Sequence, residues 1–142
     1  MSYLITPENH LIRRVPKQPS HTTRDAEGQL LLTSSVFKYA PATPQDGVSV
    51  DVLEIWLTLY SREQALHEAV FQHTTASGAI YIAAVLLAAT PFSEGLNCVH
   101  DPIPVAGHQP ANPAHSLILG TIDKTLARKL AKACVLIEQP VN

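Results

Sequence analysis

Residues 46–71 read DGVSVDVLEIWLTLYSREQALHEAVF, and this stretch decides the class of fold. It opens with Asp46-Gly47, a dipeptide that is typical of a tight turn between strands. Valine then occupies every second position over residues 48–52, which predicts a half-buried strand. Ser61 followed by Gln64 fits a capping box, so a short helix is expected over residues 62–71. A strand and a helix predicted within one short stretch indicate a fold that contains both α-helices and β-strands.

Outward from this stretch, the sequence predicts further strands bounded by prolines, glycines and turn residues. They are expected at residues 10–15, 29–38, 79–89, 97–101 and 116–120. Residues 79–89 would suit a buried helix or a buried strand, and their Tyr, Ile and Val content favours the strand. Residues 53–60 are too uniformly apolar to assign by periodicity.

The last helix has the clearest signals of all. Asp123 is a good N-cap, and apolar residues recur after it at helical spacing, at Leu126, Leu130, Cys134 and Ile137. Basic residues occupy another face at four-residue steps, at Lys124, Arg128 and Lys132. We therefore expect an α+β fold, with a mainly antiparallel sheet, two helices packed on it and a C-terminal amphipathic helix, in a single globular domain over residues 1–142.

The composition fits a globular protein and excludes several other classes. Hydrophobic residues make up 46% of the 142 residues, only 15% are charged, and the net charge is −2. This balance excludes a histone-like basic binder and an acidic disordered tail. Only 2 cysteines are present, the N-terminus lacks a secretory signal, and the longest apolar run, residues 79–89, is too short to span a bilayer. A cytoplasmic location is expected.

Charge is segregated along the chain. Residues 39–123 hold one basic residue, Arg62, against eight acidic ones, whereas both ends carry a positive balance. The basic ends either fold back on the acidic middle or form a face for an anionic partner. On the second interpretation Gly120, Lys124 and Arg128, at the start of the last helix, would bind an anion such as phosphate or nucleic acid.

Seven histidines are the most unusual feature of the composition, because histidine supplies metal ligands as well as acids and bases near neutral pH. His100, His108 and His115 lie with Asp101 in or beside a proline-rich loop. This is a possible ligand set for zinc or iron, but no spacing such as HExxH or CxxC accompanies it. The sequence therefore predicts no metal and no other cofactor.

Two segments carry candidate catalytic residues. The first begins at His21 and Arg24, where an arginine beside a histidine could hold a phosphate, or where the side chains could serve a turn. The second is Asn-Pro-Ala-His at residues 112–115, which places His115 on a stiffened loop at the mouth of a strand, or lets it bond a loop carbonyl. The candidate catalytic residues are His21, Arg24, Asp101 and His115.

The cysteines offer one further candidate. Cys98 and Cys134 are predicted to be small buried hydrophobic residues. His100, two positions after Cys98, would lie on the same face of a strand, as a thiol nucleophile would require of its base.

Five short segments resemble a pattern found in a group of small bacterial proteins. They are Arg-Arg-Val-Pro at 13–16, Ser-Ser-Val-Phe at 34–37, Ser-Val-Asp at 49–51, Asp-Pro-Ile-Pro at 101–104 and Pro-Ala-His at 113–115. The resemblance covers most of the chain. It implies a bacterial origin and brings no mechanism with it.

Two functions follow from these observations. We expect a binding or accessory module of the bacterial cytosol that acts through a protein partner. The alternative is a small hydrolase or nucleic-acid-processing enzyme that uses His21, Arg24, Asp101 and His115. No membrane association is expected, and the sequence leaves the oligomeric state open.

Overall fold

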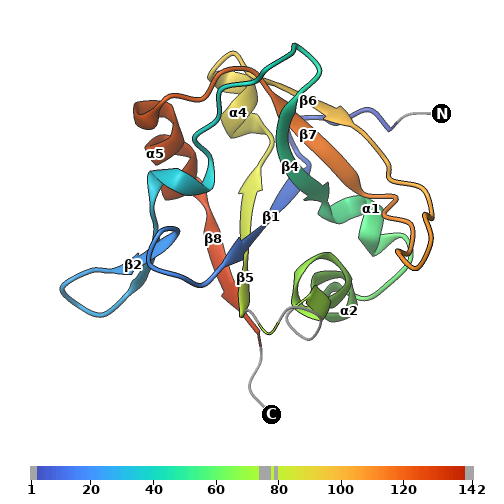
Figure 1. The fold of residues 1–142 in the computed structure, drawn as a ribbon, viewed down its shortest axis with the longest axis horizontal. Coiled ribbons are helices and arrows are strands. Elements are labelled where there is room, and N and C mark those ends of the chain that lie inside the picture. The colour runs from blue at the N-terminus through green and yellow to red at the C-terminus, as the bar shows by residue number, and fades with distance from the viewer. Residues whose placement is uncertain (1–2, 74–77, 79, 140–142) are drawn as a thin grey trace.

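The centre of the molecule is a six-stranded antiparallel sheet, and the computed structural model describes residues 3–73, 78 and 80–139. Across the sheet the strands follow the order β6-β7-β4-β1-β5-β8 (Figure 1). They are β1 (His10–Pro16), β4 (Gly47–Val52), β5 (Tyr81–Leu87), β6 (Asn97–His100), β7 (His115–Leu119) and β8 (Val135–Glu138). The predicted α+β class is confirmed.

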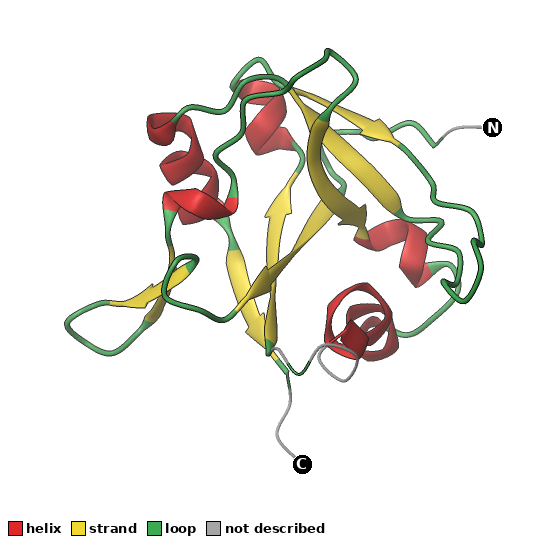
Figure 2. Cartoon of the chain, in the orientation of Figure 1, coloured by secondary structure: helices red, strands yellow, loops and turns green. Residues whose placement is uncertain are grey.

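Helices and one small hairpin surround the sheet (Figure 2). The helices are α1 (Leu53–Leu57), α2 (Arg62–Leu66), the π-helix η2 (His67–Phe71), α4 (Ala89–Ser93), α5 (Lys124–Ala133) and the 3₁₀ turn η1 (Ser34–Val36). The hairpin pairs β2 (Thr22–Arg24) with β3 (Leu30–Leu32) and extends away from the sheet. Within the described ranges, no helix combines the length and the apolar character needed to cross a membrane.

Alternation along the strands gives the sheet two buried faces. Leu11 of β1 packs with Phe37 and Leu130, on the face covered by η1 and α5. Its neighbour Ile12 packs with Trp56 and Phe71, on the face covered by α1 and the continuous helix α2–η2. Figure 1 shows these two groups of helices on opposite sides of the strands. Alternate residues along a strand therefore face different groups of helices.

Both predicted helix starts are confirmed. The Ser61 side chain accepts a hydrogen bond from the Gln64 backbone N–H at 3.3 Å, and α2 with η2 covers the expected residues 62–71. The Asp123 carboxylate accepts from the Leu126 N–H at 2.8 Å, and α5 begins at the next residue. Each cap satisfies a backbone donor that the first helical turn leaves without a partner.

Two expected boundaries are wrong. The strand expected at 29–38 ends at Leu32, because Thr33 turns the chain through bonds from its N–H to the His21 carbonyl and from its Oγ1 to the Ser20 carbonyl. The last helix ends at Ala133, so Cys134 and Ile137 do not continue it. Residues Val135–Glu138 instead pair with β5, where the open edge of the sheet supplies backbone hydrogen-bonding groups that outweigh the helical spacing.

Candidate active site

A cavity of about 450 Å³ lies between the sheet and the helices α1 and η2. Strands β1, β4 and β7 form its floor, and the loop between β6 and β7 closes one side. The lining residues with polar or aromatic side chains include Arg14, Ser49, Asp51, Trp56, Tyr60, Glu68, His73, Asn112 and His115. A concave site of this size with a few convergent polar groups is the usual form of a small-molecule site.

The strand β4 contributes its polar residues to this cavity through its alternation. Val48 and Val50 join the core under α5, so Ser49 and Asp51 face the opposite side. Asp51 lies directly across from His115 in the antiparallel pairing of β4 with β7. Side chains on one face of such a pair are close neighbours, so the pairing brings Ser49, Asp51 and His115 together.

The imidazole of His115 is held in one orientation. Its Nδ1 lies 2.8 Å from the backbone carbonyl oxygen of Asp101. A carbonyl oxygen only accepts, so Nδ1 is the donor of this bond, and in that tautomer Nε2 is the acceptor. Nε2 lies 3.2 Å from the Ser49 hydroxyl oxygen, and the Asp101 carboxylate lies 3.5 Å from Nδ1. The Ser49 hydroxyl, the His115 imidazole and the Asp101 carbonyl therefore form a row of contacts across the sheet. In this row a hydroxyl meets a base, and the base meets the group that orients it.

Asp51 forms the buried end of the site. It is only 8% exposed and accepts hydrogen bonds from Trp56 Nε1 at 2.8 Å and Asn112 Nδ2 at 3.1 Å. Burial raises the pKa of its carboxyl, although both hydrogen bonds act in the other direction. Because its two donors come from α1 and from the loop before β7, Asp51 connects two walls of the cavity.

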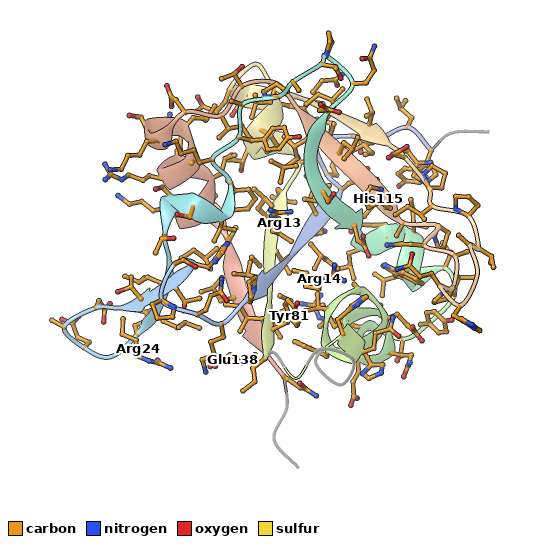
Figure 3. The ribbon with its side chains drawn as sticks, in the orientation of Figure 1. Arg13, Arg14, Arg24, Tyr81, His115 and Glu138 are labelled. Atoms are coloured by element: carbon orange, nitrogen blue, oxygen red, sulfur yellow. The ribbon has the colours of Figure 1, made fainter. Side chains whose placement is uncertain are left out.

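Two consecutive arginines on β1 have different roles. Arg13 donates from Nε to the Val36 carbonyl at 3.1 Å and from Nη1 to the Ser49 carbonyl at 2.8 Å. Burial, and then the charge of Arg14, lower the pKa of Arg13. Arg14 is exposed at the cavity, with its guanidinium carbon 5.6 Å from the centre of the Tyr81 ring (Figure 3).

A second histidine lines the cavity from the helix side. His73 follows η2, and burial together with the charge of Arg14 lowers the pKa of its imidazole. A lowered pKa favours the neutral ring near neutral pH. The cavity thus holds imidazoles on two walls, at His73 and His115.

Of the four predicted catalytic residues, the structure brings together Asp101 and His115 only. His21 Nδ1 lies 2.8 Å from Ser20 Oγ, and Arg24 donates from Nη1 to the Gly28 carbonyl at 2.9 Å. Neither residue lines the cavity, and Figure 3 shows Arg24 on the hairpin, well away from His115. His21 thus bonds a residue of the turn before β2, and Arg24 bonds a residue of the turn between β2 and β3. These contacts agree with the alternative interpretation, in which the side chains of this segment serve turns.

The predicted anion site lies on the other side of the sheet. Lys124 and Arg128 are exposed on α5, which packs against η1 and not against the cavity. Gly120 has a φ of 119°, and a Cβ there would lie 2.7 Å from Leu96 Cδ2. The positive φ, which L side chains rarely adopt, together with this close approach accounts for the glycine.

The histidine-rich loop does not assemble a set of metal ligands. His100 Nδ1 accepts from the Tyr3 N–H at 2.8 Å, and Nε2 lies 2.7 Å from the Pro113 carbonyl, so both ring nitrogens are occupied by backbone. Over the part of the chain that the structure describes, no three His, Cys, Asp or Glu residues are placed to hold a metal ion. Burial also raises the pKa of Cys98 to about 12, which disfavours a thiolate beside His100.

Sequence reasoning missed Ser49, Asp51 and Arg14. One signal for the first two was present, because the valine alternation that predicts β4 also places Ser49 and Asp51 on one face. Four of the five resembling segments also contribute lining residues to the cavity, and the fifth, residues 34–37, lies on the other face of the sheet. Arg13 links the carbonyls of Val36 and Ser49, and His115 links Asp101 to Ser49.

Comparison with known proteins adds no further information about function, since no family model, curated protein or solved structure matches the chain.

Proposed function

We propose that the chain is a hydrolase of small carboxylic esters, with Ser49 as the nucleophile and His115 as its base. The observation that carries the proposal is the 3.2 Å contact from Ser49 Oγ to His115 Nε2, while Nδ1 is anchored to the Asp101 carbonyl at 2.8 Å. Covalent catalysis by serine requires a base within hydrogen-bond reach and a third group that orients the base. This is the alternative function expected from the sequence, with Ser49 added and His21 and Arg24 removed.

The proposed reaction has two halves. Ser49 Oγ bonds to the ester carbon while its proton passes to His115 Nε2, and the departing alcohol takes that proton as the ester bond breaks. Water then attacks the acyl group on Ser49 and gives a proton to Nε2. This proton returns to Ser49 Oγ as the acid leaves. The Asp101 carboxylate, 3.5 Å from Nδ1, stabilises the imidazolium in both halves.

The expected binding module that acts through a protein partner stays a prediction, as do its bacterial origin and its cytoplasmic location. The exposed bases Lys124 and Arg128 of α5 support a second surface for phosphate or nucleic acid. That surface and the cavity lie on opposite faces of the sheet. A partner on α5 and a reaction in the cavity are therefore compatible.

The proposal is tested by hydrolysis of 4-nitrophenyl acetate. Ser49→Ala and His115→Ala should each lower the rate by about 10³-fold or more, as expected for the loss of a nucleophile or its base. Ser93→Ala and His21→Ala are matched controls outside the cavity and should keep the wild-type rate. Equal rates in Ser49→Ala and wild type, or no hydrolysis by wild type, would overturn the proposal.

A further inference from the structure

We infer that the cavity selects compounds in which a planar ring carries an anionic group, with the anion on Arg14 and the ring against Tyr60. This names the substrate class of the same site and rests on the proposed hydrolase for the reaction. Binding is nevertheless measured without turnover, so the two proposals can fail separately.

Among the residues that the structure describes, none forms a hydrogen bond with the Arg14 side chain. It is exposed, lines the cavity and has its guanidinium beside the Tyr81 ring, where the ring face steadies the cation. The ion pairs of the described residues are His10–Glu54, Lys17–Glu138, His115–Asp101 and Lys129–Glu94, and none of them includes Arg14. A planar guanidinium with unused donors matches the geometry of a carboxylate or a phosphate.

The carboxylates of the cavity are occupied by other partners. Asp51 accepts from Trp56 and Asn112, and burial affects the pKa of its carboxyl more strongly than the charge of Arg14 does. Glu68 accepts from Gln64 Nε2 at 3.1 Å on the helix. Among the described residues, neither carboxylate forms an ion pair with Arg14, and an anionic ligand would supply one.

Aromatic side chains form the wall beside α1. Trp56 is 5% exposed and fixed through its Nε1 bond to Asp51, while Tyr60 is 39% exposed at the cavity. Their ring centres lie 5.9 Å apart with the planes tilted by 32°. A fixed indole behind a more accessible phenol gives a planar ligand ring a surface to pack against.

The single tryptophan provides a direct probe, because Trp56 is the only one in the chain and lines the cavity. Tryptophan fluorescence is followed in the full-length Ser49→Ala protein during titration with benzoate, phenyl phosphate and neutral benzamide. The same titrations are made with Arg14→Gln and Tyr60→Leu added. Arg24→Gln, an arginine on the hairpin outside the cavity, is the matched control for charge. Far-UV circular dichroism and thermal melts confirm that each variant is folded.

We expect saturable quenching by benzoate, by phenyl phosphate or by both, and a much weaker effect of benzamide. Quenching by one anion alone identifies that group as the one Arg14 recognises. Arg14→Gln should weaken binding by about 10- to 100-fold, the value of a charge-assisted hydrogen bond, while Arg24→Gln leaves it unchanged. Tyr60→Leu should also weaken it. Benzamide binding as tightly as the anions, no binding of either anion, or unchanged affinity in Arg14→Gln would overturn the inference. Anion binding without hydrolysis by wild type would contradict the proposed reaction alone.

Discussion

The Arg13 guanidinium donates from Nη1 to the carbonyl oxygen of Ser49 at 2.8 Å. This bond links two neighbouring strands of the sheet, because β1 pairs with β4. The same side chain donates from Nε to Val36, at the end of η1. The half-buried Arg13 side chain thus joins strand β4 of the sheet to the 3₁₀ turn η1. The backbone of the proposed nucleophile is held by this contact, on the face opposite to its own hydroxyl.

Arg13→Ala should destabilise the protein much more than Arg14→Ala. The Arg13 change leaves two carbonyls without a charged donor, and such a loss costs about 1–3 kcal/mol. The Arg14 side chain makes no such bond to the residues that the structure describes, so its removal should have little effect. Urea unfolding of the two variants and the wild type measures the difference. Equal stability of the two variants would show that the Arg13 contacts contribute nothing.

Asp51 should make stability depend on pH in an unusual direction. Its pKa is raised in the folded protein, so the folded state binds this proton more tightly than the unfolded chain does. The wild type should therefore gain stability relative to Asp51→Asn as the pH falls from the raised pKa toward the unfolded value of about 3.9. Urea unfolding of both proteins at a series of pH values measures this difference. A relative loss of wild-type stability on acidification would contradict burial of the carboxyl.

Glu54 should change the pH dependence of stability in the direction opposite to Asp51, and it serves as the comparison for Asp51 within the same protein. Burial acts to raise its pKa, but hydrogen bonds from the His10 backbone N–H at 2.7 Å, from the His10 side chain and from Asn9 outweigh burial and lower it. Its contribution to stability is present above the unfolded pKa of about 4.3 and is lost as the pH falls through the folded value. The wild type should therefore lose stability relative to Glu54→Gln on acidification, over the same titration. An identical pH dependence for Asp51→Asn and Glu54→Gln would show that the two environments do not differ.

The cysteines should be unreactive in the native protein. Burial raises the pKa of Cys98 and of Cys134 to about 12, so both remain thiols near neutral pH. A bulky disulfide reagent should label them slowly until denaturant is added, which a colorimetric assay of the released thiolate follows. Rapid labelling of Cys98 in native protein would instead favour the Cys98–His100 pair as a reactive site.

Local patterns predicted most of the fold. The valine alternation of β4, the Ser61 cap and the Asp123 cap each depend on residues within one element, and each is found in the structure. The end of α5 at Ala133 could not be predicted from local patterns. Residues 135–138 form a strand because β5 offers them an edge, and that edge is set by the sheet and not by local spacing.

The site was harder to predict for the same reason. Ser49 and His115 are separated by 66 positions, and only the pairing of β4 with β7 makes them neighbours. His21 and Arg24 are close in sequence, but each bonds a residue of a neighbouring turn and neither lines the cavity. Arg13 and Arg14 are identical residues in the sequence, but Arg13 bonds the carbonyls of Val36 and Ser49 whereas Arg14 is exposed at the cavity.

If Ser49 is a nucleophile activated by His115, it should react with a fluorophosphonate in the native protein. This reagent bonds to a serine whose hydroxyl proton is removed by a neighbouring base. Mass spectrometry of the native protein should find the adduct on Ser49, and His115→Ala should abolish it, while His21→Ala keeps it. An unmodified Ser49, or equal labelling in His115→Ala, would show that His115 does not activate Ser49 as a nucleophile.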